Sequence, residues 1–155
     1  MKHMIFFGLT FLLSIVSFSQ NAASRVKHFN LENSPAINGF DPVAYFKQNK
    51  AVKGNKSFAV SHSGVTYYFS SKTNKDLFLK NPATYEPQYG GWCAYAMGNT
   101  GEKVEIDPET FKIVNGKLYL FYNAYLTNTL KSWNKDESNL KIKADKNWQN
   151  FLNTK

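Results

Sequence analysis

The sequence predicts an α+β fold in which two antiparallel β-hairpins form a small sheet covered by short helices, with a C-terminal helix packed against it. Three observations support this prediction. Two pairs of β-favouring runs are each joined by a two-residue turn that contains glycine. A short polar residue precedes proline at three places, a pattern typical of helix starts. A stretch near the C-terminus has apolar residues at helical spacing.

The N-terminus has the features of a secretory signal peptide over residues 1–19. Lys2 provides a positive charge, and an uncharged apolar run follows from Met4 to Phe18. Ser17 and Ser19 place small residues three and one positions before Gln20, which predicts cleavage after Ser19. We therefore expect an exported protein, periplasmic or extracellular, without a transmembrane segment after cleavage. An uncleaved membrane anchor is the alternative, although the apolar run is shorter than the roughly 20 residues that a spanning helix needs.

The remaining chain is predicted to be one domain behind a short leader. Residues 20–33 are polar and aperiodic, which predicts a flexible leader. Residues 34–155 then form a single domain, which is long enough to bury a core rich in aromatic side chains. Cys93 is the only cysteine, so no intramolecular disulfide can form.

The positive charge of the chain is diffuse. Lysine and arginine together number 19 against 11 acidic residues, which gives a formal net charge of +8. The basic residues are scattered singly, and no run of five or more occurs. This distribution argues against nucleic-acid binding and favours solubility with loose attraction to anionic partners.

Two hairpins are predicted around glycine turns. Residues 57–70 contain β-favouring runs on either side of Ser63-Gly64, where glycine can adopt the positive φ that a tight turn needs. Residues 112–122 flank Asn115-Gly116, which is the strongest short-range hairpin signal in the chain.

Helices are predicted between and after the hairpins. Asp41, Asn81 and Asp107 each precede a proline, so each side chain can cap the exposed N–H groups of a helix that begins there. Residues 72–80 are predicted to form a short helix that ends before Asn81. The C-terminal helix buries an apolar face made of Leu140, Ala144, Trp148, Phe151 and Leu152.

Four stretches of the chain together resemble the YHS domain family, in its branch of small exported proteins. These stretches are Ile37 to Phe46 (INGFDPVAYF), Ser61 to Phe69 (SHSGVTYYF), Phe78 to Tyr85 (FLKNPATY) and Tyr89 to Met97 (YGGWCAYAM). The resemblance covers residues 36–148. It implies a small α+β domain and a connection with metals, because related domains occur beside heavy-metal transporters.

The chain departs from the metal-associated branch of this family at the metal-binding positions. In that branch, one cysteine follows the Asp-Pro-Val motif, another follows Tyr-Tyr-Phe, and a third stands four residues further on. Ala44, Ser70 and Asn74 occupy these positions here. Because none of them provides a thiolate, the soft-metal site of that branch is not carried over to this chain.

Cys93 and Met97 are the candidate metal ligands that the sequence does offer. If this stretch is helical, residues four apart place both sulfurs on one face. A thiolate and a thioether form a soft pair that favours Cu(I), with His62 or His28 as a further ligand. The alternative is that both sulfur side chains fill the core, as these residue types often do.

Aromatic residues around Gly90-Gly91 form a second candidate site. The glycine pair predicts a bend in the chain. The faces of the surrounding aromatic rings can line a cleft for a small ligand with Cys93 at its base, or they can form a wall of the core. The aromatic residues are Tyr85, Tyr89, Trp92 and Tyr95.

These observations lead to three functional hypotheses. The first is an exported, non-catalytic binding domain of YHS type whose ligand is copper or another soft metal. The second is an aromatic-lined module that binds a small ligand or a protein without metal. The third is a thiol enzyme with Cys93 as nucleophile and His62 as base, although the sequence has no characteristic motif around the cysteine.

Overall fold

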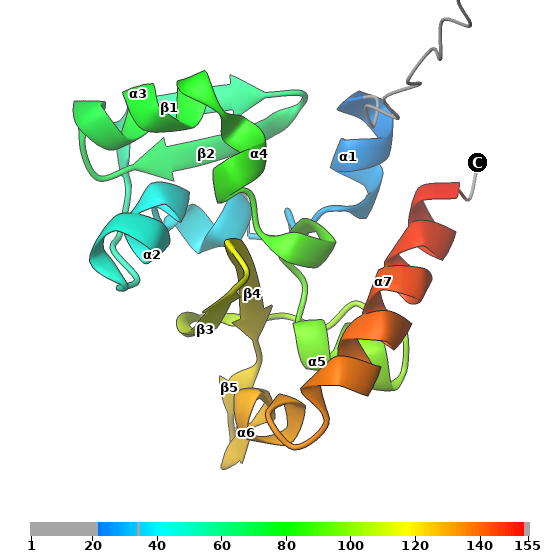
Figure 1. The fold of residues 1–155 in the computed structure, drawn as a ribbon. Coiled ribbons are helices and arrows are strands. Elements are labelled where there is room, and N and C mark those ends of the chain that lie inside the picture. The colour runs from blue at the N-terminus through cyan, green and yellow to red at the C-terminus, as the bar shows by residue number, and fades with distance from the viewer. Residues whose placement is uncertain (1–21, 34, 154–155) are drawn as a thin grey trace, which may run out of the picture.

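Short helices and two-stranded antiparallel sheets make up the structure, which confirms the predicted α+β class (Figure 1). The computed structural model describes residues 22–33 and 35–153. The predicted signal peptide and its cleavage site lie outside these residues. Within the described ranges, no helix combines the length and the apolar character that membrane crossing requires.

The helices in chain order are α1 (Ala22–His28), η1 (Ala36–Gly39), α2 (Pro42–Gln48), α3 (Lys72–Lys80), α4 (Pro82–Tyr85), η2 (Gln88–Gly91), α5 (Ala94–Asn99), α6 (Thr129–Trp133) and α7 (Glu137–Asn153), of which η1 and η2 are 3-10 helices. The strands are β1 (Asn55–His62), β2 (Val65–Phe69), β3 (Asp107–Val114), β4 (Lys117–Phe121), β5 (Asn123–Ala124) and β6 (Thr127–Asn128).

Both predicted hairpins are confirmed, as β1–β2 and β3–β4. They do not join into one small sheet, however, because each remains a separate two-stranded sheet. The second edge of β4 carries parallel bridges from Pro87 to Leu118 and from Cys93 to Leu120. The chain on either side of η2 therefore occupies the second edge of β4.

Two of the three predicted helix starts are confirmed. The Asp41 carboxylate accepts hydrogen bonds from the backbone N–H groups of Val43 and Ala44, at 2.9 and 3.3 Å, and thereby caps α2. Pro82 is the first residue of α4, although the Asn81 side chain makes no capping hydrogen bond.

The third predicted helix start, at Asp107-Pro108, is wrong. Asp107 begins strand β3. Its carboxylate accepts from the backbone N–H of Glu109 at 3.0 Å and from the Thr110 hydroxyl at 2.7 Å. The bond from the Glu109 N–H is one that a helix cap would also make, so the pattern of short polar residue and proline does not distinguish the two outcomes.

Residues 22–28 form helix α1, in a segment for which the sequence predicts a flexible leader. Arg25 and His28 are buried, at 7% and 5% exposure. The His28 carbonyl accepts a hydrogen bond from the Trp92 indole at 2.7 Å, and the Asn30 N–H donates to the Gly90 carbonyl at 2.9 Å. The polar sequence of this segment does not predict these contacts, because their partners lie some 60 residues further along the chain.

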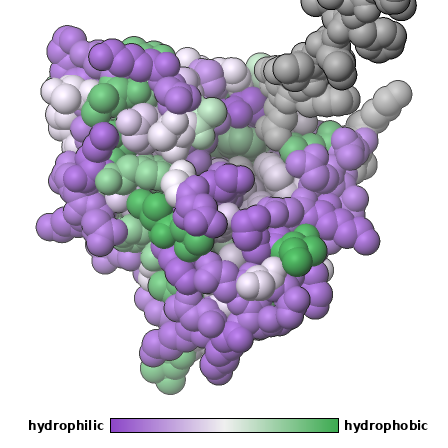
Figure 2. All heavy atoms as spheres, in the orientation of Figure 1, coloured by the Kyte–Doolittle hydropathy of each residue, from purple (hydrophilic) through white to green (hydrophobic). Residues whose placement is uncertain are grey.

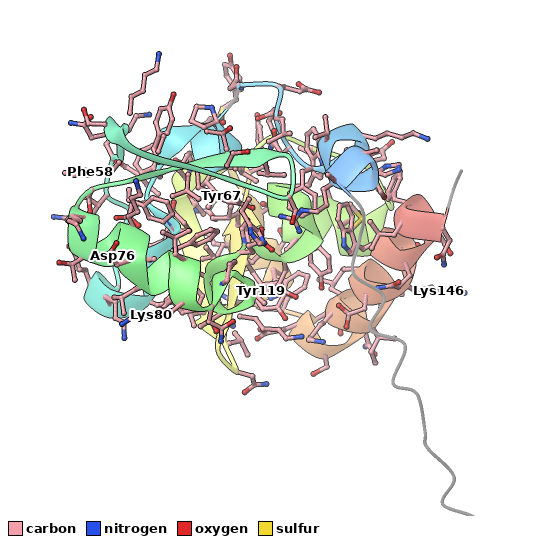
Figure 3. All side chains as sticks on the ribbon, turned by 90° about the horizontal axis from the view of Figure 1, so that it is seen from above. Phe58, Tyr67, Asp76, Lys80, Tyr119 and Lys146 are labelled. Carbon is pink, nitrogen blue, oxygen red and sulfur yellow. The ribbon has the colours of Figure 1, made fainter. Side chains whose placement is uncertain are left out.

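The core lies between the hairpins and α7. Tyr67 and Tyr119, from β2 and β4, lie inside the molecule, whereas Asp76, Lys80 and Lys146 lie at its periphery (Figure 3). The predicted apolar face of α7 is confirmed, with Leu140, Ala144 and Trp148 buried. Helix α5 packs closely on α7. Glycine at position 98 permits this approach, since a Cβ there would overlap with the Leu140 carbonyl oxygen.

A third hairpin, β5–β6, was not predicted. Its turn residues Tyr125 and Leu126 have positive φ, at 48° and 65°, and their side chains are almost fully exposed. Hydrophilic side chains cover most of the face shown in Figure 2, and a hydrophobic patch marks the tip of this hairpin at the bottom of the view.

Substitution of Gly116 tests the β3–β4 turn. Asn115 and Gly116 both have positive φ, at 51° and 70°, and a Cβ at Gly116 would meet nothing within 4 Å. Gly116→Val therefore costs backbone strain without a clash, and we expect a loss of about 1 kcal/mol or more in the free energy of unfolding. Chemical denaturation measures this loss. Asn115→Gly is the control, since glycine adopts positive φ freely; an equal loss in both variants would contradict the explanation.

Candidate functional site

Cys93 is fully buried at the residue that precedes α5. Its sulfur accepts a hydrogen bond from the Tyr122 N–H at 3.4 Å and lies 3.4 Å from the Thr129 hydroxyl oxygen. The Thr129 hydroxyl donates its own proton to the Tyr122 carbonyl at 2.9 Å, so the thiol is the donor in the contact with Thr129. This arrangement satisfies a protonated Cys93 from within the protein.

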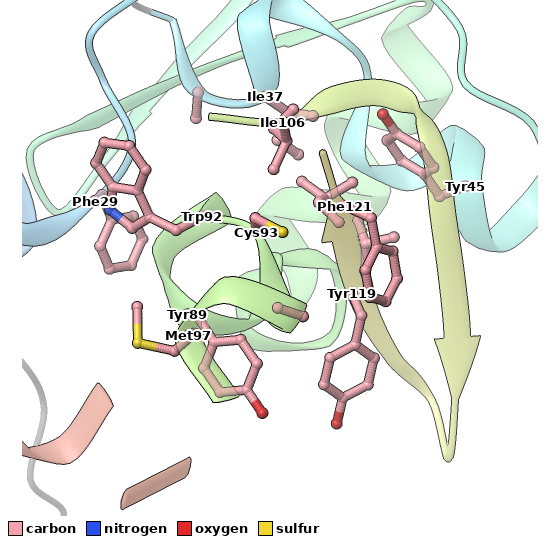
Figure 4. Close-up of a cluster of buried hydrophobic side chains, with 14 of the residues drawn as sticks. Phe29, Ile37, Tyr45, Tyr89, Trp92, Cys93, Met97, Ile106, Tyr119 and Phe121 are labelled. Carbon is pink, nitrogen blue, oxygen red and sulfur yellow. The ribbon is translucent and has the colours of Figure 1, made fainter. Parts of the chain in front are cut away.

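Met97 lies one helical turn after Cys93, as predicted, and is also fully buried. The two side chains diverge, however: the Cys93 sulfur points towards β4 and the Met97 thioether points away from it (Figure 4). His62 lies at the end of β1 with its ring edge-on to Phe78, at a centroid distance of 5.9 Å. Metal binding by Cys93, Met97 and His62 stays a prediction.

The other candidate metal ligand, His28, is buried beside Lys103, whose Nζ lies 3.3 Å from the imidazole Nδ1. Burial lowers the pKa of His28, and the charge of Lys103 lowers it further. Across residues 22–33 and 35–153, no group of three or more His, Cys, Asp or Glu side chains is placed to hold a metal ion.

The four aromatic residues predicted to surround a cleft lie in different settings. The Tyr85 ring packs edge-on against Phe46 at 5.5 Å, and the Trp92 indole is bound to the His28 carbonyl. Tyr95 is half-buried against the core. Of the four, only Tyr89 lines a pocket that the described residues form between α1, η2 and α7.

This pocket has a volume of about 530 Å³ and opens between α1, η2 and α7. Phe29, Tyr89 and Trp148 form its aromatic walls. The predicted bend at Gly90 is confirmed, with a φ of 61°, and a Cβ there would lie 2.8 Å from both the Phe29 and the Trp148 rings. Glycine at this position therefore allows the two walls to meet at the bend.

A buried ion pair joins α1 to the far side of the pocket. The Arg25 guanidinium forms a bidentate pair with the Glu86 carboxylate, and the Tyr67 hydroxyl donates to the same carboxylate at 2.7 Å. Burial and the Glu86 charge raise the pKa of Tyr67 well above its ordinary value, so Tyr67 remains a neutral donor. The charge of Glu86 is thus compensated within the protein.

A second carboxylate at the pocket, Asp145 of α7, is also fully partnered. The Tyr89 hydroxyl donates to it at 2.9 Å and the Lys141 ammonium at 2.7 Å. Burial raises the pKa of Tyr89, and the hydrogen bond to Asp145 raises it further. The same carboxylate raises the pKa of Lys141, which keeps this lysine charged.

The three positions that hold cysteine in the metal-associated branch cluster around Asp41, which is fully buried. Its Oδ2 accepts from the Ser70 N–H at 2.8 Å, the Ser70 hydroxyl at 2.6 Å and the Asn74 amide at 2.7 Å. Its Oδ1 accepts from Val43 and Ala44. A hydrogen-bonded carboxylate therefore lies among Ala44, Ser70 and Asn74.

The family model of the YHS domain matches residues 43–89. The chain contains a YHS domain. The matched residues run from α2 to η2 and include the Ser70 and Asn74 positions, whereas Cys93 and Met97 follow them. No curated protein and no solved structure matches the chain.

The pocket lies where the YHS domain meets the rest of the chain. His62, Glu86 and Tyr89 belong to the matched residues, whereas Arg25 and Trp148 lie outside them. Sequence reasoning missed this site because its walls come from opposite ends of the chain. One signal was present: Arg25 is the single arginine among the 19 basic residues. A chain that otherwise uses lysine places arginine where a bidentate carboxylate partner needs it.

The state of Cys93 is open to a direct test. Because the thiol is fully buried, we expect it to react with a thiol reagent only after unfolding, and Cys93→Ala to cost about 1 kcal/mol of stability. Rapid labelling of the folded protein would contradict this expectation. Cu(I) binding that both Cys93→Ala and Met97→Leu weaken would support the metal hypothesis instead.

Proposed function

We propose that this protein is an exported, non-catalytic binding domain of YHS type that takes a small organic ligand into the pocket between α1, η2 and α7. The pocket itself is the observation that supports this proposal. Its volume of about 530 Å³ lies within the range of small-molecule sites in proteins. Polar and charged groups make up most of its lining beside the edges of three aromatic rings, and convergent polar groups of this kind fix the orientation of a ligand.

The chemistry of the pocket favours binding over catalysis. Glu86 and Asp145 are both held in ion pairs, so neither is a free general base. The Cys93 thiol is buried and is not among the side chains that line the pocket. A thiol enzyme needs its nucleophile at the ligand, which this arrangement does not provide.

Export is tested by the N-terminus of the mature protein. The signal features of residues 1–19 lead us to expect a first residue at Gln20 when the protein is produced in a secreting host. Intact mass spectrometry of the exported fraction measures this. An unprocessed chain that remains in the membrane fraction would contradict the proposal of export.

Ligand binding in the pocket is tested by blocking it. Ala83 lies exposed on α4 at the edge of the pocket, so Ala83→Phe fills the opening without disturbing the core. We expect ligands from a set of small organic acids, amides and amines to shift the Trp148 indole signal in NMR spectra, and Ala83→Phe to reduce their affinity about tenfold or more.

Thr84→Phe is the matched control, because Thr84 is exposed on the same helix but does not line the pocket. Ligands whose binding both variants leave unchanged bind elsewhere on the protein. Such a result for every ligand in the set would contradict the proposed site.

A further inference from the structure

We propose that the ligand of this pocket is a small organic carboxylate, which places its charged group at Lys117 and its apolar body against the exposed edges of Phe29, Tyr89 and Trp148. This inference rests on the function proposed above. It concerns the chemical class of the ligand, and it follows from which charges at the pocket are already compensated and which are not.

Lys117 is the charged side chain at the pocket that the protein leaves uncompensated. The carboxylates of Glu86 and Asp145 are paired with Arg25 and Lys141, and each accepts a further tyrosine hydroxyl. Lys117, exposed at the start of β4, has no hydrogen bond or ion pair with a side chain of residues 22–33 and 35–153. The free charge that the pocket presents to a ligand is therefore positive.

A second unfilled donor lies behind the wall of the pocket, where a ligand reaches it only if the Arg25 side chain shifts. The Nε–H group of Arg25 is buried and has no hydrogen-bond partner among the described residues. A buried donor without a partner costs roughly 1–3 kcal/mol, so an acceptor that reaches it is favoured. His62 and Gln149, which also line the pocket, add neutral hydrogen-bonding groups around the same space.

The same charges argue for a carboxylate over other charged groups. An amine would face Lys117, and it would find both carboxylates already engaged. A phosphate dianion would meet a single free cation and two carboxylates in the surrounding walls, which repel a second negative charge. A monoanion on a small apolar body matches one free lysine beside the exposed edges of three largely buried aromatic rings.

The test uses four probes that share a phenyl ring: phenylacetate, its neutral isostere phenylacetamide, phenethylamine and phenyl phosphate. Titration of the full-length mature protein, followed through the Trp148 indole signal, gives the affinity of each. We expect phenylacetate to bind most tightly. Lys117→Gln should weaken phenylacetate about twofold to fivefold and leave phenylacetamide unchanged.

Lys131→Gln is the matched control, because it removes the same charge from an exposed position on α6 away from the pocket. Equal weakening by both lysine variants would overturn the inference, since it would reduce the effect to net charge. Tighter binding of phenyl phosphate or phenethylamine than of phenylacetate would also overturn it.

The test separates this inference from the function on which it rests. If phenylacetate and phenylacetamide bind equally and Ala83→Phe still blocks both, the pocket remains a ligand site and the carboxylate inference fails. If none of the four probes shifts the Trp148 signal, the proposed function fails together with the inference.

Discussion

The ion pair between Arg25 and Glu86 holds together two parts of the chain that are distant in sequence. Burying two charges is unfavourable by itself, and the attraction between them offsets this cost only when the geometry is good and the remaining hydrogen-bonding atoms are satisfied. The bidentate contact and the Tyr67 hydroxyl meet most of that requirement. Helix α1 is thereby fixed against the YHS domain, and the pocket acquires one of its walls.

Asp41 has a comparable role inside the YHS domain. One carboxylate receives five hydrogen bonds, from α2, from the end of β2 and from α3. The positions at which the metal-associated branch has cysteine thus surround a carboxylate whose acceptor atoms are occupied. Asp41 therefore contributes to the stability of the domain and leaves no free acceptor at these positions.

Local sequence signals predicted local structure well and distant contacts poorly. Asn115-Gly116 predicted its hairpin because the backbone preference of two residues decides such a turn. Asp107-Pro108 misled because the Asp107 side chain can satisfy either a helix or a turn. Helix α1 was not predicted because its stabilising contact, the ion pair of Arg25 with Glu86, joins residues that are distant in the sequence.

In the candidate site, too, local spacing was predicted correctly and the contacts between distant residues were not. Cys93 and Met97 attracted attention because they stand four residues apart, yet the fold turns their sulfurs in different directions. Of the predicted aromatic residues, Tyr89 reaches the pocket because the bend at Gly90 brings its segment against α1 and α7. No local motif sets Lys117 or Asp145 apart in a lysine-rich sequence. Their place in the lining of the pocket is therefore visible only in the three-dimensional structure.

The pocket draws walls from both α1 and α7, which sets a time order on its assembly. Ribosomes add about 5–20 residues per second, so Arg25 exists for roughly 6–24 seconds before the chain reaches Asp145 and Trp148. A nascent chain that has not yet reached α7 lacks one side of the pocket. The proposed ligand site therefore forms only after α7 has been synthesised, because Asp145 and Trp148 belong to its lining.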